Sequence, residues 1–325
     1  MSLNSQKLKD LLSIDFSLIM APMFLVTNYE MVAEAIKNGI MGTFPTLNFR
    51  KDGELESIIK NLHEVKGPGN FGVNLIVQQT NPMYKKHLAV CVDNKVPFYI
   101  TSLGNPKEVI EKAHSYGAKV FCDVTNVTHA KKVQELGCDG FIAVGAGAGG
   151  HAGPIALHVL VERLSELFPD TPVLAAGGIS TGKAMKAMEV LGAAGSSVGT
   201  RFIATKEASV SEEYKNAIVD YDMNDTIMTE KLSGTPCSVI ATPYAKKMGT
   251  KQGWFEKLMS KNKKIRKYFK MIVQYRGMKK LEEAIQPGNY KTLWSAGQSI
   301  AMISEVLTVS EVISKMKSEY ENAGT

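Results

Sequence analysis

Cysteine is scarce and scattered in this chain of 325 residues. The four cysteines form no CxxC pair and no cluster with histidine; they are Cys91, Cys122, Cys138 and Cys237. The sequence also lacks a carboxylate pair and any closely spaced set of metal ligands. We therefore expect no disulfide framework, no metal site and a reducing, cytoplasmic environment.

Long apolar runs are missing as well. No stretch reaches the ~18–20 residues that cross a bilayer. The N-terminal sequence MSLNSQKLKDLLSIDFSLIM contains no hydrophobic segment followed by a small-residue cleavage site. We expect neither membrane insertion nor secretion. The hydrophobic fraction of 44% is ordinary for a globular protein and allows a sizeable core.

Short β-branched runs alternate with longer segments of helical period up to about residue 220. Several of the runs are apolar on both faces, which is typical of parallel strands covered on both sides. The predicted strands are Leu18–Pro22, Ile40–Phe44, Phe71–Ile76, Val96–Thr101, Ala118–Asp123, Gly140–Val144, Pro172–Ala176 and Gly195–Gly199. The predicted helices include Asn28–Asn38, Pro106–Tyr116, Val127–Leu136, Ala156–Leu167 and Thr181–Leu191.

This alternation predicts an α/β fold, and the eight strands favour a closed (β/α)8 TIM barrel over an open doubly wound sheet. Glu207–Val219 is predicted as the last barrel helix and Val309–Tyr320 as a terminal helix. We assign residues 1–220 plus 291–325 to the barrel. Residues 221–290 are polar, rich in Met and Lys and without strand alternation, and they predict a helical excursion after strand eight.

Three glycine clusters directly follow predicted strands. They are the run Gly145–Gly153, the pair Gly177-Gly178, and Gly199 with Thr200. In a barrel all three open onto the C-terminal face, where phosphate sites recur after strands seven and eight. Glycine lets the backbone approach a ligand and turn its N–H groups toward an anion. These turns therefore predict a phosphate site, with plain tight turns as the alternative.

The first glycine cluster also matches the dinucleotide fingerprint G-x-G-x-x-G at Gly145, Gly147 and Gly150. That fingerprint requires a helix opening within the loop and an acid ending the next strand. Here Pro154 follows the loop and the nearest acid, Asp170, precedes the next strand. We reject the Rossmann interpretation.

His151 lies among these glycines, on a loop predicted to face the ligand. An imidazole there titrates near neutrality and suits a general base, and its neighbours have almost no side chains to pack it. A structural role for His151 is the alternative. The other histidines lie on predicted helices or their edges and are interpreted as surface or packing residues; they are His63, His87, His114, His129 and His158.

The motifs IMAPM, GVNL, GCDGFIAVGAGAGGHAG, AAGGIS and GTRFIAT together resemble the FMN-dependent nitronate monooxygenases, also called 2-nitropropane dioxygenases. They also resemble the related FMN-dependent enoyl-[acyl-carrier-protein] reductases. The resemblance covers roughly residues 15–240 plus a short piece around WSAGQ. It implies an FMN-binding barrel, His151 as the active-site histidine, and contacts to the cofactor from a larger set of residues. That set is Ala21, Pro22, Met23, Asn74, Lys119, Asp139, Ala148, Gly149, Gly150, Gly177, Gly178, Gly199, Thr200 and Gln298.

The implied reaction is the oxidation of alkyl nitronates by O2 to carbonyl compounds and nitrite, with His151 first deprotonating a neutral nitroalkane. The alternative is reduction of enoyl thioesters on acyl carrier protein with NAD(P)H. The chain departs from the family pattern at Gly147, where glutamate is frequent, and in the loop after the second strand, which carries Pro45, Asn48 and Arg50. Arg50 is a hypothetical partner for an anionic substrate group. A homodimer is compatible with the sequence.

Acidic residues are almost absent from residues 251–280, which contain eleven Lys or Arg and one acid, Glu256. This segment carries +10 against +6 for the whole chain, so the remainder sums to −4. A charge-rich segment of this kind most often forms the solvent-exposed face of a helix. A patch that steers acidic acyl carrier protein is a second interpretation. Binding of nucleic acid or a membrane surface is a third, which we do not expect for a barrel with a histidine–glycine loop.

Overall fold

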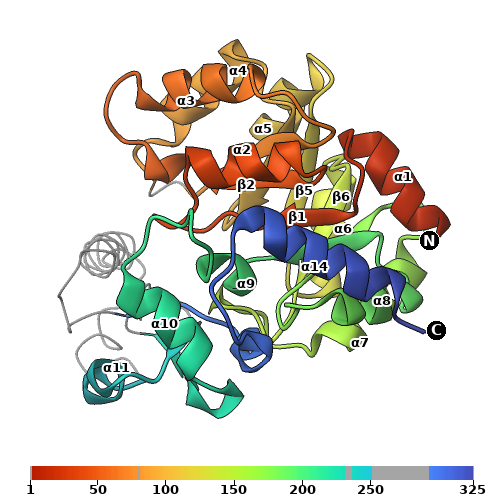
Figure 1. The fold of residues 1–325 in the computed structure, drawn as a ribbon. Coiled ribbons are helices and arrows are strands. Elements are labelled where there is room, and N and C mark those ends of the chain that lie inside the picture. Colours follow the sequence, from red (N-terminus) through yellow and green to blue (C-terminus); the bar gives the residue numbers. More distant parts are fainter. Residues whose placement is uncertain (1, 79–80, 231–235, 251–292, 325) are drawn as a thin grey trace, which may run out of the picture.

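Eight parallel strands close into a barrel in the computed structural model, which describes residues 2–78, 81–230, 236–250 and 293–324 (Figure 1). Each strand pairs with the next, and the last pairs with the first. The strands are β1 (Leu18–Met20), β2 (Met41–Pro45), β3 (Asn70–Ile76), β4 (Phe98–Ser102), β5 (Lys119–Val124), β6 (Gly140–Val144), β8 (Val173–Ala176) and β9 (Gly195–Val198). The predicted barrel is confirmed.

The N-terminal end of the barrel is closed by helix α1 (Leu3–Leu12). Its Leu8 and Leu12 join the apolar cluster formed by inward-facing strand side chains such as Phe98 and Phe121. The backbone carbonyl of Leu12 accepts a hydrogen bond from the side chain of Asn70, the first residue of β3. Because this end is filled, a ligand reaches the barrel at the C-terminal ends of the strands, where barrel sites lie.

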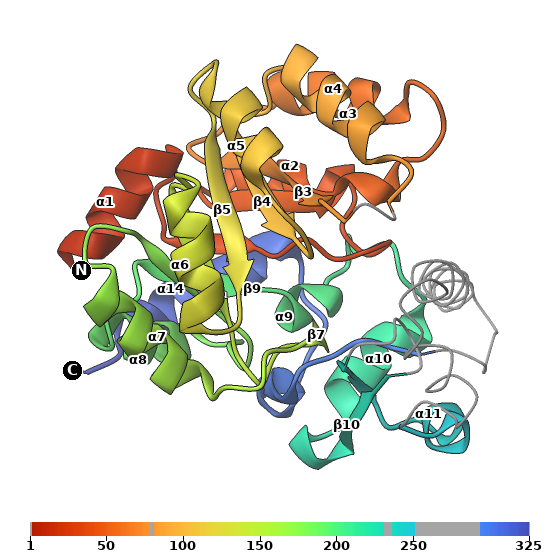
Figure 2. The same cartoon turned by 180° about the vertical axis from the view of Figure 1, so that it is seen from behind.

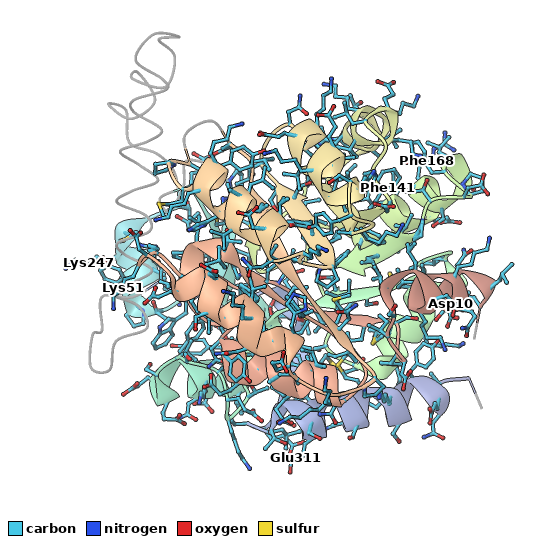
Figure 3. The ribbon with its side chains drawn as sticks, turned by 90° about the horizontal axis from the view of Figure 1, so that it is seen from above. Asp10, Lys51, Phe141, Phe168, Lys247 and Glu311 are labelled. Atoms are coloured by element: carbon cyan, nitrogen blue, oxygen red, sulfur yellow. The ribbon has the colours of Figure 1, made fainter. Side chains whose placement is uncertain are left out.

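An outer layer of helices covers the strands, as a parallel sheet requires. Between the two layers, Phe141 of β6 packs edge-on against Phe168, with ring centroids 5.1 Å apart (Figure 3). The helices are α2 (Tyr29–Lys37), α3 (Glu54–His63), α4 (Tyr84–Asp93), α5 (Lys107–His114), α6 (Val127–Glu135), α7 (Leu157–Leu167), α8 (Gly182–Val190) and the C-terminal α14 (Val309–Glu321). No helix within the described ranges is long and apolar enough to cross a membrane.

Helix α14 lies between α8 and α2 and completes the outer layer (Figure 1). Its fit against α8 is close, since a Cβ on Gly182 would stand 2.0 Å from the carbonyl oxygen of Met316. The expectation that Glu207–Val219 is the last barrel helix is therefore wrong. That region forms α10 (Glu212–Asp220), which follows the short α9 (Thr200–Ile203) and packs beside it.

A small antiparallel sheet lies beside the C-terminal end of the barrel (Figure 2). It joins β7 (Gly150–His151), from the loop after β6, to β11 (Cys237–Ile240) and β10 (Thr226–Thr229). The expectation that residues 221–290 lack strands is wrong at β10 and β11. Three short helices accompany the sheet, η2 (Met223–Asp225), α11 (Pro243–Met248) and η3 (Gln298–Met302). The basic segment 251–280 lies outside the described residues.

Candidate functional site

Four backbone segments converge at the C-terminal end of the barrel: the loops after β6, β8 and β9, and the turn that leads into η3. A Cβ on Gly177 would stand 2.7 Å from the backbone nitrogen of Ala148, and one on Gly297 would stand 2.4 Å from the carbonyl oxygen of Gly147. The backbone N–H of Gly297 donates to Thr200 Oγ1 at 3.1 Å. The predicted meeting of these glycine loops is present.

The turn after β8 exposes backbone donors. Gly177 (φ +107°) and Gly178 (φ +73°) both adopt a conformation that side chains disfavour. Their N–H groups donate to no acceptor within the part of the chain that the structure describes. No heavy atom of the described residues lies within 4 Å of a Cβ built on Gly178, so the space beside it is open. Since β8 pairs with β9, this turn adjoins Gly199 and Thr200. The arrangement is chemically suited to an anion such as a phosphate.

The segment after β1 borders the loop after β9. The backbone N–H of Ala21 donates to the carbonyl of Val198 at 2.8 Å. The sulfur of Met23 lies 3.6 Å from the position of a Cβ on Gly199. Ala21, Pro22 and Met23 thus lie beside the loop after β9, at the C-terminal end of β1.

Gln298, the first residue of η3, is exposed and directly follows Gly297. A Cβ on Gly149 would stand 2.7 Å from the nitrogen of Gly297, so Gln298 is held next to the loop after β6. The hydroxyl of Ser238 on β11 donates to the carbonyl of Ala296 at 2.7 Å and fixes the same turn. Gln298 therefore belongs to the rim of this site.

His151 lies on β7, where its backbone pairs with Cys237 of β11. Its side chain keeps an exposed surface. Even so, the protein around the ring desolvates it and lowers the pKa of His151 below its usual value. The imidazole is therefore neutral at pH 7, the state in which it can accept a proton.

Asn74 is buried at the C-terminal end of β3. Its Nδ2 donates to Ser102 Oγ at 2.8 Å and to the carbonyl of Ile100 at 3.3 Å. Ser102 Oγ in turn donates to Asp123 Oδ2. Burial raises the pKa of Asp123 to about 6, and the Ser102 hydroxyl opposes the shift. Sequence reasoning missed Ser102 and Asp123, although Asp123 ends a predicted strand, Ser102 directly follows one, and each lies two residues after a large interior side chain.

Lys119 and Asp139 are not brought to the glycine loops. Lys119 is the first residue of β5 and Asp139 directly precedes β6, so both lie at the N-terminal ends of the strands. Asp139 accepts hydrogen bonds there from His114 Nε2 at 2.7 Å and the backbone N–H of Val120 at 2.8 Å, and it faces Lys119 Nζ at 3.5 Å. The prediction that these two residues contact the cofactor is corrected by their position, because the site lies at the opposite end of the strands.

The loop after β2 is held by its own side chains. Asn48 accepts a hydrogen bond from the backbone N–H of Leu25 and donates to the carbonyl of Thr27. Arg50 donates from Nε to the carbonyl of Leu47, and its guanidinium lies 5.3 Å from the ring centroid of Phe24. Asn48 thus ties the loops after β1 and β2 together. Arg50 packs at the same rim.

Groups of three or more His, Cys, Asp or Glu that could hold a metal ion are absent from the described residues. The site is instead built from backbone amides, an imidazole and the amide–hydroxyl–carboxyl chain of Asn74, Ser102 and Asp123. Such a set suits an anionic organic ligand better than a metal ion.

Known proteins resemble this chain in structure or in sequence. FabK from Thermotoga maritima superposes with a TM-score of 0.83 and 30% identity over 97% of this chain and 96% of that chain. The (3aS,4S,5R,7aS)-5-hydroxy-7a-methyl-1-oxo-octahydro-1H-indene-4-carboxyl-CoA dehydrogenase of Rhodococcus jostii (strain RHA1) is 29% identical, with 72% of this chain aligned to 65% of that protein. A probable nitronate monooxygenase of Staphylococcus aureus (strain JH9) is 26% identical over 77% of this chain and 82% of that protein.

A family model described as nitronate monooxygenase matches residues 79–319, more than half of the chain. The matched range contains the strands from β4 to β9, the histidine–glycine loop and the glycine turn after β8. The chain therefore belongs to the nitronate monooxygenase family.

Proposed function

We propose that this protein is an FMN-dependent enzyme that oxidises alkyl nitronates with O2 to carbonyl compounds and nitrite. One observation carries the proposal: the amides of Gly177 and Gly178, which donate to no acceptor among the described residues, lie against the same loop that carries His151. A phosphate at those amides would direct the rest of its molecule toward the histidine loop. Membership of the nitronate monooxygenase family supports the reaction class.

The residues of the site fit FMN. The amides of Gly177 and Gly178, with Gly199 and Thr200 beside them, would hold the phosphate. The backbone of Ala21–Met23 and of the loop after β6, the amide of Asn74 and the side chain of Gln298 would border the rest of the cofactor. When bound, FMN supplies the redox chemistry, which none of these side chains can perform.

His151 would act on the substrate. A neutral nitroalkane carries an acidic α-proton, and the neutral imidazole of His151 can remove it to give the nitronate. After the transfer the imidazolium lies beside the nitronate anion and stabilises it. A substrate supplied as the nitronate has already lost this proton and does not need the base.

Cofactor content and turnover test the proposal. The purified protein is expected to show the visible absorption of bound flavin, and heat-released cofactor is expected to be FMN. Oxygen uptake with a primary nitronate should produce nitrite in proportion to carbonyl product. A colourless protein that also fails to bind added FMN would refute the cofactor assignment. A yellow protein that neither consumes O2 nor releases nitrite with nitronates would refute the substrate class.

A second candidate is the NAD(P)H-dependent reduction of an enoyl thioester on acyl carrier protein. It is favoured by the likeness to FabK, an enoyl-ACP reductase, over nearly the whole chain. Anaerobic addition of NADH or NADPH separates the two functions. Prompt bleaching of the bound flavin by the nicotinamide supports the reductase, whereas bleaching by a nitronate alone supports the oxidation proposed above.

A further inference from the structure

Three polar side chains occupy neighbouring strands at the C-terminal end of the barrel interior. Ser102 lies two residues beyond Ile100 on β4, and Asp123 lies two residues beyond Phe121 on β5. Ile100 and Phe121 belong to the interior cluster. Because side chains alternate along a strand, Ser102 and Asp123 face the same interior. Asn74 on the adjacent β3 completes the row.

The direction of the hydrogen bonds along this row is fixed. A carboxylate only accepts, so the single hydroxyl proton of Ser102 goes to Asp123 Oδ2. Ser102 Oγ must then accept from Asn74, and the second N–H of that amide is used by the carbonyl of Ile100. Both donors of the Asn74 amide are therefore occupied, and its Oδ1 is the atom left to meet a ligand.

We propose that Ser102 and Asp123 are positioning residues that hold the Asn74 amide with its oxygen toward the bound ligand, so that the site selects a heterocycle presenting an N–H donor. The imide N–H of the FMN ring is such a donor. This inference rests on the proposed function, since it concerns the contact between this chain and the FMN ring.

The alternative amide orientation is disfavoured by the surroundings. Rotating Asn74 by half a turn would place its oxygen against the Ile100 carbonyl and against a hydroxyl whose proton is already committed to Asp123. Within the described residues, burial and the Ser102 hydroxyl are the two influences on the pKa of Asp123, about 6. At pH 8 the carboxyl of Asp123 is thus ionised and can only accept. The hydrogen bonds then run from Asn74 to Ser102 and from Ser102 to Asp123, as in the structure.

Binding of two cofactors at pH 8 tests the inference. We compare FMN with 3-methyl-FMN, in which a methyl group replaces the imide hydrogen, by quenching of flavin fluorescence. The ratio of the two dissociation constants is measured for the wild type, Ser102→Ala and Asp123→Ala. Ser102→Thr keeps the hydroxyl. Thr101→Val is the matched control, because Thr101 is the neighbouring residue on the same strand and its hydroxyl donates to the sulfur of Cys122 in the outer layer, away from the row.

We expect the wild type, Ser102→Thr and Thr101→Val to prefer FMN by about tenfold, the effect of one hydrogen bond. In Ser102→Ala and Asp123→Ala the Asn74 amide can rotate. The preference for FMN over 3-methyl-FMN should then fall to about two- to threefold, because the hydrogen bond is made only part of the time. The steric effect of the methyl group on 3-methyl-FMN is the same for all variants, so it cancels when their ratios are compared. If Ser102→Ala binds FMN and shows the same ratio of the two dissociation constants as the wild type, the positioning role is refuted, while the proposed function stands. A wild type that binds neither cofactor overturns the proposed function.

Discussion

Replacing Gly178 by alanine separates binding of the cofactor phosphate from stability of the fold. Gly178 has φ +73°, and among the residues that the structure describes no heavy atom lies within 4 Å of the position of an added Cβ. The folded protein therefore loses only the cost of a left-handed backbone at a non-glycine residue, about 1–2 kcal/mol. The added methyl group, however, occupies the open space beside the amides that we assign to the phosphate.

The magnitude for binding follows from the hydrogen bonds at risk. Hydrogen bonds to a charged group contribute about 1.5–3 kcal/mol each. Loss or lengthening of one such bond in Gly178→Ala should raise the dissociation constant of FMN by about 10- to 100-fold.

Gly177→Ala is the matched comparison on the neighbouring residue. There the added Cβ would stand 2.7 Å from the nitrogen of Ala148 and 2.9 Å from its Cα, at φ +107°. Backbone atoms cannot move aside as a flexible side chain can, so strain and overlap together should cost on the order of 3 kcal/mol or more. Gly177→Ala is thus expected to damage the fold, and Gly178→Ala mainly the affinity.

Urea denaturation of the apo proteins measures the free energy of unfolding, and fluorescence titration measures FMN affinity. If Gly178→Ala binds FMN as tightly as the wild type, the phosphate does not bind at these amides. If both variants lose the same free energy of unfolding, the contact between Gly177 and Ala148 is not the constraint described above.

Three further predictions concern single side chains. His151→Gln should lower kcat/KM for a neutral nitroalkane by about 10²–10⁴-fold but much less for the preformed nitronate; equal losses in steady-state assays would exclude a role as base. His87 is buried with its Nδ1 unpaired within the described residues, and burial lowers its pKa to about 4. In the unfolded chain His87 takes up a proton with a pKa near 6.5, whereas in the native state it stays neutral down to about pH 4. The free energy of unfolding should therefore fall by up to about 3 kcal/mol as the pH drops from 6.5 to 4. Urea unfolding at the two pH values should show this loss in the wild type but not in His87→Leu. Leu8→Ala should cost about 2–5 kcal/mol of unfolding free energy without changing FMN affinity, because α1 closes the opposite end of the barrel; a large loss of affinity would contradict that separation.

The barrel strands were predictable because each is a short apolar run bounded by polar turns. Observed strand ends lie within two residues of the predicted ones throughout, for example Phe98–Ser102 against the predicted Val96–Thr101. The glycine turns were equally visible, since only glycine tolerates the backbone overlap found between Gly177 and Ala148. Local sequence carried these features.

The remaining features depend on contacts between distant parts of the chain. Strand β7 has two residues and no pattern of its own, and it exists because β11 pairs with it. The partnership of Ser102 with Asp123 depends on the pairing of β4 with β5. Lys119 and Asp139 were misplaced by family resemblance, although their position at strand starts already pointed to the N-terminal end.

The pairing of β7 with β11 makes the histidine loop part of a sheet that the barrel does not contain. The position of His151 is thus set by residues encoded much later in the chain, after the barrel strands are complete. Substitutions in β10 and β11 can shift the imidazole relative to the glycine turns while leaving every barrel strand unchanged. Changes in this appended sheet therefore act on the site from outside the barrel, without a change in the strand pairing that closes the barrel.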